Sequence, residues 1–327
     1  MSLLSVRQLT TLFPVAGRHV AVVSDVSFDI ARGETLALVG ESGSGKTMTA
    51  YSLMRLVPPP GQIVGGEILL DGQDLRSLGD DAMDRVRGAR LSLIFQEPLS
   101  ALNPIMTIGQ QLMEALDVHG LGGADRRRTA LDMLTTVRMD DPSRRFAEYP
   151  HQLSGGLRQR ALIALALACR PAVVIADEPT TALDVTVQAE ILNLLRQLKH
   201  EFGLSLLLIT HDLGVVAHTA DRVAVMYAGR IVEQAPVRQL FRAPSHPYTQ
   251  ALLRAMPGAS HSQARRLDAL DGQGPSPDEP LPGCAFEPRC PWRHEACTQD
   301  MPAMYEVCEA HTSRCLLVKA ARGWEGQ

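Results

Sequence analysis

The feature that most constrains this chain is a glycine-rich stretch from Gly40 to Thr47, with the sequence Gly-Glu-Ser-Gly-Ser-Gly-Lys-Thr. It fits the pattern G-x-x-x-x-G-K-[ST], whose backbone N–H groups surround the phosphates of a nucleotide. The glycines let the backbone approach the phosphate oxygens closely, and the helix that follows directs its N-terminus at the anion. Lys46 is predicted to contact the β- and γ-phosphates, and the Thr47 hydroxyl to bind Mg²⁺. The other residues predicted to contact the nucleotide here are Gly40, Ser42, Gly43, Ser44 and Gly45.

The flanks of this loop agree with the pattern. Residues 34–39 are apolar enough for a buried strand, and residues 48–56 suit a helix that ends before three consecutive prolines. Strand, loop and helix therefore follow in the order that a phosphate-binding loop needs. The alternative, a glycine-rich turn before an ordinary helix, is disfavoured by this order.

Composition places the chain among soluble globular proteins. It has 327 residues, of which 45% are hydrophobic and 21% charged, with a formal net charge of −4. This charge argues against a surface for nucleic acid. No apolar run reaches the roughly 18 residues of a membrane span, and the first residues lack the layout of a signal peptide, so we expect a cytosolic protein.

The segments before and after the loop add to this picture. Residues 3–9 and 20–30 have strand patterns, and Phe13 lies between them. Phe13 could stack on an adenine base or simply pack under the sheet, and the sequence favours neither. A strand at residues 90–95 ends at Gln96, and helical periodicity then dominates to about residue 150, which predicts a helical insertion in an α/β domain.

A second serine- and glycine-rich stretch, Ser154-Gly155-Gly156, stands at the head of a predicted helix. Ser154 is placed to cap that helix, and its N-terminus could bind an anion. Taken alone, the stretch is better explained as a well-capped helix.

Carboxylates follow the next apolar strand, residues 172–176. Asp177 and Glu178 stand where ligands bind in parallel α/β sheets, so Asp177 is predicted to hold Mg²⁺ and Glu178 to polarise the attacking water. Because adjacent side chains on a strand point in opposite directions, one can face the metal and the other the γ-phosphate. The strand at residues 205–210 ends at His211, which could contact the γ-phosphate or the water.

Together these elements resemble the ATP-binding subunits of ABC transporters. The resemblance rests on the Gly40–Thr47 loop, Gln96, Leu153-Ser-Gly-Gly156, Val173-Val-Ile-Ala-Asp-Glu178, Ala182-Leu-Asp184 and His211, all in the family's order. It implies a P-loop NTPase core with a RecA-like sheet and an antiparallel β subdomain. It also implies that two such subunits dimerise head to tail around ATP, with Ser154, Gly155 and Gly156 reaching the γ-phosphate bound by the other subunit.

The same resemblance assigns roles to single residues. Glu178 would be the general base, Asp177 and Gln96 would attend Mg²⁺ and water, and His211 would sense the γ-phosphate. The resemblance also places Asp184 in the family's D-loop, as a further candidate for contacting the nucleotide.

Several stretches are similar to one branch of that family, the oligopeptide, dipeptide and nickel importers. They are residues 94–104, 149–156, 180–188, 226–233 and 244–253. The branch implies a second, different ATPase subunit, two transmembrane permease subunits and, indirectly, an extracytoplasmic binding protein, at the cytoplasmic face of the inner membrane. Residues 87–108 look more like the first of the two ATPase subunits.

Five of the six cysteines lie within 32 residues near the C-terminus, at positions 284, 290, 297, 308 and 315. Their spacing alone does not distinguish zinc from an iron–sulfur cluster. The importer branch carries a similar C-terminal extension with a four-iron four-sulfur cluster, which implies Cys284, Cys290, Cys297 and Cys315 as ligands. Cys308 would replace Cys315 if the alignment were displaced.

These inferences predict an ABC ATPase domain at residues 1–256, with a helical subdomain at about 97–160 inserted in it. A linker at 257–283 and a cysteine-rich extension at 284–327 would follow. The predicted function is to power import of dipeptides or oligopeptides. A nickel or metal-chelate importer is the alternative within the class, and a soluble ABC ATPase acting on nucleic acid or ribosomes is the alternative from another class. The cysteine-rich extension favours peptides over nickel and argues against an exporter.

Overall fold

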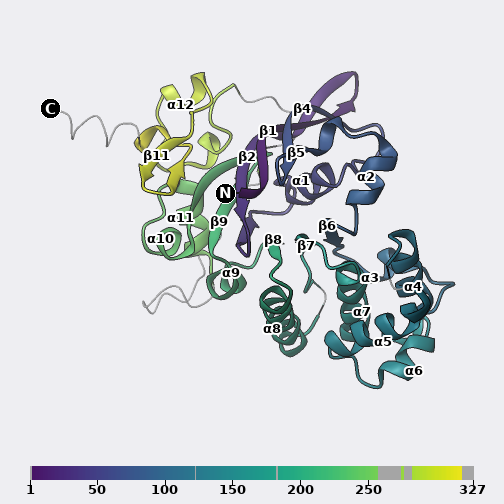
Figure 1. The fold of residues 1–327 in the computed structure, drawn as a ribbon. Coiled ribbons are helices and arrows are strands. Elements are labelled where there is room, and N and C mark those ends of the chain that lie inside the picture. The colour runs from purple at the N-terminus through teal and green to yellow at the C-terminus, as the bar shows by residue number, and fades with distance from the viewer. Residues whose placement is uncertain (1, 122, 182, 257–273, 276–281, 319–327) are drawn as a thin grey trace. The chain divides into compact units, whose positions relative to one another are not determined.

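The computed structural model describes residues 2–121, 123–181, 183–256, 274–275 and 282–318. The chain divides into two compact units, each built from segments that are distant in sequence (Figure 1). The first unit contains residues 1–4, 30–35 and 69–209, and the second contains residues 5–29, 36–68 and 210–327.

The first unit is built on three parallel strands in the order β8-β7-β6. They are β6 (Leu91–Ile94), β7 (Val173–Asp177) and β8 (Ser205–Thr210). Leu93 is in register with Ile175, and Ile175 with Leu207. All the residues of the three strands are buried, as expected for parallel strands that are covered on both faces.

Helices form most of the rest of the first unit, and Figure 1 shows those between β6 and β7 gathered together. Two of the longer ones begin where the sequence supplies a cap: Thr107 and Gln110 form a capping box, and Asp184 accepts a hydrogen bond from Val187 N. The helical segments are η1 (Leu75–Ser77), α2 (Asp80–Val86), α3 (Pro98–Ala101), α4 (Ile108–Val118), η2 (Gly123–Asp125), α5 (Arg126–Thr136), α6 (Pro142–Ala147), η3 (Pro150–Gln152), α7 (Gly155–Leu167) and α8 (Val185–Phe202).

The main sheet of the second unit mixes parallel and antiparallel pairs in the order β3-β9-β10-β12-β11. β3 runs parallel to β9, β10 runs antiparallel to both β9 and β12, and β11 runs antiparallel to β12. Its strands are β3 (Thr35–Val39), β9 (Arg222–Tyr227), β10 (Arg230–Pro236), β11 (Tyr305–Cys308) and β12 (His311–Ser313). Segments from both ends of the chain thus share one sheet.

Three helices of this unit, α9 (Leu213–Thr219), α10 (Val237–Arg242) and α11 (Pro247–Arg254), pack in a core that includes three aromatic rings, those of Tyr227, Tyr248 and Phe286. The ring of Tyr227 lies 4.5 Å from that of Tyr248 and 5.4 Å from that of Phe286, and all three side chains are almost fully buried. The helical segments are α1 (Lys46–Leu53), α9 (Leu213–Thr219), α10 (Val237–Arg242), α11 (Pro247–Arg254), η4 (Glu287–Arg289) and α12 (Ala296–Gln299).

A further set of strands comes from the first 74 residues. These strands are β1 (Ser2–Val15), β2 (Arg18–Ala31), β4 (Gln62–Leu70) and β5 (Gln73–Asp74). In the second unit β2, β1 and β4 pair in that order. Arg7 joins β1 to β2 by an ion pair with Asp29, in which Arg7 Nη2 lies 2.7 Å from Asp29 Oδ1. The end of β4 pairs with β5 in the first unit.

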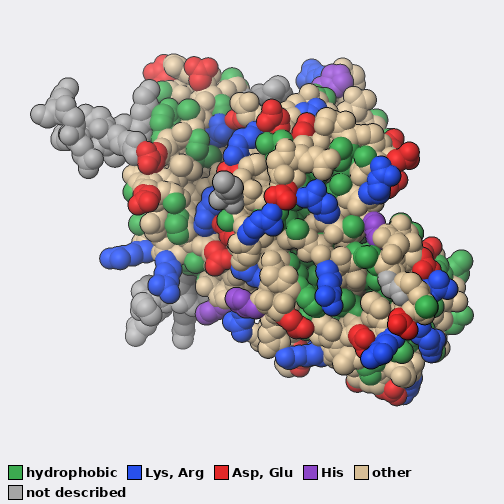
Figure 2. All heavy atoms as spheres, viewed as in Figure 1, with side chains coloured by type: hydrophobic (Ala, Val, Ile, Leu, Met, Phe, Trp, Pro, Cys, Tyr) green, Lys and Arg blue, Asp and Glu red, His purple; other side chains and the backbone are tan. Residues whose placement is uncertain are grey.

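Three regions named in the sequence analysis fall partly outside the described residues. These are most of the predicted linker at 257–283, residues 319–327 of the predicted extension at 284–327, and Ala182 of the Ala182-Leu-Asp184 stretch. In the described part of the chain, no helix has the length and apolar character that a membrane crossing needs. On the face shown in Figure 2, basic and acidic side chains are interspersed.

Candidate active site

The Gly40–Thr47 loop connects β3 to α1 in the second unit, and close backbone packing explains two of its glycines. Gly45 precedes the first residue of α1 with φ 102°, and a Cβ on it would lie 2.5 Å from Val22 O. A Cβ on Gly40 would lie 2.2 Å from Met226 O. Such separations are shorter than any van der Waals contact, so neither position accepts a larger residue without a shift of the backbone.

Lys46 is the first residue of α1, and its ammonium folds back onto the loop. Its Nζ donates to Gly40 O at 2.8 Å, to Glu41 O at 2.9 Å and to Ser44 Oγ at 3.4 Å, and the residue is only 5% exposed. The loop thus holds a partly desolvated positive charge at the N-terminus of a helix, where an anion is favoured.

The rest of the loop leaves room for a phosphate. At Gly43, which has φ 78°, no described atom lies within 4 Å of the place where a Cβ would stand. Ser42 is exposed, Ser44 is buried and Thr47 is half-buried in the first turn of α1. An open backbone next to a held ammonium suits a phosphate group, so the residues fit the nucleotide predicted for them.

Phe13 and His211 also lie in the second unit. Phe13 is half-buried, and its ring lies so close to Gly61 that a Cβ there would stand 2.3 Å from Phe13 Cζ. The ring of Phe13 therefore packs against Gly61 on at least one side. Its stacking on adenine stays a prediction. His211 is exposed, just before Asp212, which caps α9 by accepting from Gly214 N and Val215 N.

Glu178 and Gln96 meet in the first unit. Gln96 Nε2 donates to Glu178 Oε2 at 3.1 Å, and Thr181 Oγ1 donates to the same oxygen at 2.9 Å. The two donors fix the orientation of the carboxylate. Thr181 was missed in the sequence analysis, although its hydroxyl three residues after an acidic residue could have indicated it.

The backbone at Glu178 differs from the expectation. β7 ends at Asp177, and Glu178 has φ 44°, so the alternation of side chains along a strand does not set its direction. A turn into the left-handed region does so instead, and Glu178 N donates to Ile209 O of β8 at 2.9 Å. Such backbone conformations in a residue other than glycine are uncommon and are enriched at functional sites.

Asp177 is 1% exposed and is the last residue of β7, in register with Ile209. Carboxylate oxygens are the ligands that Mg²⁺ takes, so the donor chemistry fits this ion.

Ser154, Gly155 and Gly156 lie at the N-terminus of α7 in the same unit. The expected cap is confirmed, since Ser154 Oγ accepts a hydrogen bond from Leu157 N. A Cβ on Gly156 would lie 2.9 Å from Val187 Cγ1, so the glycine lets α7 approach α8 closely. Asp184 caps α8 three residues before Val187, which places Asp184 near the Ser154–Gly156 stretch.

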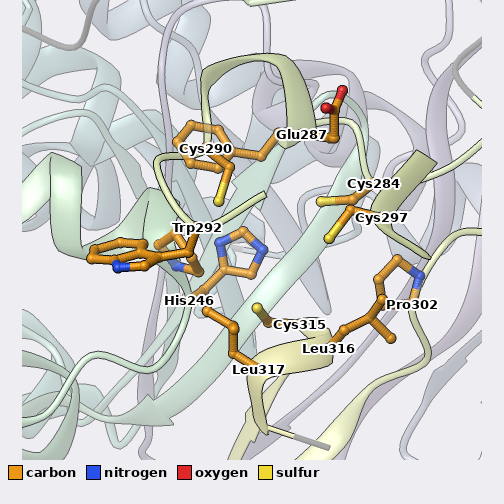
Figure 3. Close-up of a pocket in the computed structure, with 12 residues that line it drawn as sticks. His246, Cys284, Glu287, Cys290, Trp292, Cys297, Pro302, Cys315, Leu316 and Leu317 are labelled. Atoms are coloured by element: carbon orange, nitrogen blue, oxygen red, sulfur yellow. The ribbon is translucent and has the colours of Figure 1, made fainter. Parts of the chain in front are cut away.

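The C-terminal cysteines gather in part around one pocket of the second unit, shown in Figure 3. Cys284, Cys290, Cys297 and Cys315 line it together with apolar side chains that include Trp292 and Leu317. Cys308 is exposed on β11, with its Sγ 3.9 Å from Gln239 Oε1.

The structure contradicts the prediction that these cysteines bind a metal cluster. The described residues contain no group of three or more His, Cys, Asp or Glu side chains that could hold a metal ion. Burial raises the pKa of Cys284, Cys290 and Cys315. The predicted four-iron four-sulfur cluster, and zinc as its alternative, are therefore not supported. Cys284 and Cys290 pack against the apolar core of the second unit.

Comparison with known proteins places these observations in a family. Residues 23–181 match the family model for ABC transporters. Residues 232–297 match the model for the C-terminal region of oligopeptide/dipeptide transporters.

Relatives match along nearly the whole chain. A probable peptide ABC transporter ATP-binding protein of Sinorhizobium fredii is 48% identical over 315 residues, covering 96% of this chain and 94% of the relative. The oligopeptide transport ATP-binding protein AppD of Bacillus subtilis is 46% identical over 318 residues and covers 97% of both chains.

Solved structures agree with the fold. A dimeric ATP-binding cassette in a post-hydrolysis state, bound to ADP and Pi, has a TM-score of 0.65 at 28% identity, covering 72% of this chain and 99% of that one. A component of an ABC transporter complex from Clostridium perfringens has a TM-score of 0.64 at 25% identity, covering 74% and 91%. The α/β fold with a mixed sheet is that of an ABC ATPase, and the chain belongs to the ATP-binding proteins of ABC transporters.

Proposed function

We propose that the chain hydrolyses ATP to power the import of dipeptides or oligopeptides, together with a second ATPase subunit and two membrane permease subunits. The observation that carries the nucleotide part is the Gly40–Thr47 loop, which holds the Lys46 ammonium against two of its own carbonyl oxygens. The match of residues 232–297 to the C-terminal region of oligopeptide/dipeptide transporters supports the peptide cargo.

In this proposal the loop binds the phosphates with backbone N–H groups and with Lys46. Gly40, Gly43 and Gly45 keep the backbone accessible, while Ser42 and Ser44 add hydroxyl groups. Thr47, Asp177 and Gln96 would be the residues that attend Mg²⁺, as the resemblance to the family implies. The ion would neutralise charge on the phosphates. Phe13 would stack on the adenine base.

Hydrolysis needs a base for the attacking water, and Glu178 takes that role. Hydrogen bonds from Gln96 and Thr181 to Oε2 orient the Glu178 carboxylate, which would accept the proton of the water. His211 would contact the γ-phosphate. Because little covalent chemistry is required, positioning and charge stabilisation supply most of the rate enhancement.

The Ser154–Gly156 stretch suits a role at a second nucleotide. The N-terminus of α7 carries a serine cap and two glycines, and the 13-residue helix directs its positive end at this point. We propose that Ser154, Gly155, Gly156 and Asp184 contact the ATP held by the partner ATPase subunit. The loop at Gly40–Thr47 would in turn receive the partner's equivalent stretch.

The domain organisation belongs to the same proposal. The helices at about 97–160 form a subdomain that is inserted in the ATPase domain. This subdomain docks on the permease subunits. The residues after 283 form a C-terminal extension. A binding protein outside the membrane would select the peptide. The chain itself would sit at the cytoplasmic face of the inner membrane.

Glu178→Gln tests the hydrolytic mechanism. The variant keeps the size of the side chain but removes the base, so we expect ATP binding to persist while turnover falls by a factor of about 10² to 10⁴. ATP binding and phosphate release would be measured on the complex with its permeases. A variant that turns over ATP at the rate of the parent protein would exclude Glu178 as the base.

Cargo is tested by uptake. Cells that lack this chain should lose accumulation of labelled dipeptides or oligopeptides, and the parent chain but not Lys46→Ala should restore it. Labelled nickel measured in parallel distinguishes the alternative importer. Loss of nickel uptake with intact peptide uptake would refute the peptide assignment.

A further inference from the structure

The C-terminal part of the chain reaches the phosphate loop at Glu41, the second residue of that loop. Arg289 Nη1 donates to Glu41 Oε2 at 2.9 Å, and Arg289 Nη2 donates to Glu41 Oε1 at 3.1 Å. Tyr248 also contacts this residue, because Glu41 N donates to Tyr248 Oη at 2.9 Å. All three residues belong to the second unit.

The two residues that hold Glu41 are themselves rigidly placed. Tyr248 is fully buried, and the side chain of Arg289 is 8% exposed. The guanidinium of Arg289 lies 5.9 Å from the ring centres of both Tyr227 and Phe286, and it donates to Tyr227 Oη at 3.2 Å. Because packing already orients the planar guanidinium, it loses little conformational entropy when its two nitrogens bind a carboxylate.

Glu41 in turn contacts Lys46, the residue proposed to bind the phosphates. Its carbonyl oxygen accepts the hydrogen bond from Lys46 Nζ at 2.9 Å. The N–H, carbonyl and carboxylate of one loop residue are therefore all held, by Tyr248, Lys46 and Arg289 respectively.

We propose that Arg289 and Tyr248 are positioning residues for nucleotide binding, which fix Glu41 and thereby hold the loop in the shape that places Lys46. This inference rests on the use of the Gly40–Thr47 loop for ATP. It gives the C-terminal extension a task in the ATPase cycle that does not depend on a metal. The extension keeps the empty loop ready for ATP.

Loss of this link should affect affinity more than turnover. Without it the loop must be ordered when ATP binds, and part of the binding free energy is spent on that ordering. Bound phosphates then hold the loop themselves. We therefore expect a higher KM for ATP with kcat reduced less than twofold.

The test uses the full-length chain and measures Kd for ATP with Mg²⁺ by calorimetry, and KM and kcat in the complex with its permeases. Arg289→Gln should weaken ATP binding about tenfold, which corresponds to about 1.4 kcal/mol. Tyr248→Phe keeps the buried ring and removes only the hydroxyl, so a smaller loss of about threefold is expected. The matched control is Arg293→Gln, because Arg293 lies in the same extension with a 60% exposed side chain and pairs with Glu287 instead.

A double-mutant cycle separates positioning from general stability. Glu41→Gln should weaken binding as much as Arg289→Gln, and the double variant should lose no more than either single one. Additive losses, or unchanged Kd in Arg289→Gln, Tyr248→Phe and Glu41→Gln alike, would overturn the inference.

Lys46→Ala in the same series distinguishes this inference from the proposed function. If the parent chain binds ATP and Lys46→Ala does not, the loop is the nucleotide site, and the cycle then decides the role of Arg289. If Lys46→Ala binds ATP like the parent, the loop assignment fails and the inference fails with it.

Discussion

Replacing Glu233 should loosen the attachment of the C-terminal segments to the sheet of the second unit. Glu233 lies on β10 and is fully buried. Its carboxylate accepts from Ser245 N at 2.6 Å and from His246 N at 2.9 Å, and it lies 2.7 Å from His311 Nε2. One side chain thus ties β10 to the start of α11 and to β12.

The expected cost follows from these three contacts. In Glu233→Gln the amide oxygen can take the place of only one carboxylate oxygen, so the NH₂ group faces a backbone N–H that loses its acceptor. The remaining bonds also lose their charge assistance. A buried donor without a partner costs about 1–3 kcal/mol, and hydrogen bonds to a charged group contribute about 1.5–3 kcal/mol each, so we expect about 3 kcal/mol in all.

Amide hydrogen exchange detects this loss locally. The Ser245 and His246 amides should exchange about two orders of magnitude faster in Glu233→Gln at fixed pH, since about 1.4 kcal/mol changes an equilibrium tenfold. Glu309→Gln is the matched control, because Glu309 is exposed in the turn between β11 and β12. Exchange within a factor of three of the parent protein would refute the view that Glu233 anchors these segments.

Three further predictions follow from single contacts. Gly45→Ala should abolish ATP binding, because φ 102° and the 2.5 Å approach of a carbonyl oxygen exclude a side chain, and equilibrium binding of ATP checks this. Thr181→Val should lower kcat about tenfold with little change in KM, since it removes one of two donors that orient Glu178. A rise in KM with an unchanged kcat would argue against that role. Burial raises the pKa of Asp29, but hydrogen bonds from Arg7 and Ser5 outweigh it, so the folded-state pKa lies below 3.8. Stability from this carboxylate is present above pH 3.8 and is lost as the pH falls through the lower folded pKa, so acid unfolding curves of Asp29→Asn should be flatter there.

Local patterns determined much of what the sequence could predict. The strand before Gly40, the helix after it, the cap at Ser154 and the apolar strands ending at Asp177 and Thr210 all depend on neighbours within a few residues. Backbone propensity and side-chain period act over that range, so one sequence suffices to predict them.

Contacts between distant segments could not be predicted in this way. The left-handed turn at Glu178 depends on the backbone of β8, which begins 27 residues later, and the sequence suggested a plain strand instead. The metal cluster was expected from the resemblance to the importer branch, whereas the described residues contain no group of side chains that could hold a metal ion.

The phosphate loop shows both sides. Its eight residues by themselves indicated a site that binds nucleotide phosphates, because glycine geometry and a lysine at a helix N-terminus are local properties. Only the tertiary structure revealed that Arg289, 248 positions further along the chain, holds the second residue of that loop. An ion pair between residues so far apart exists only once the sheet has brought both ends of the chain together, and no local pattern encodes that step.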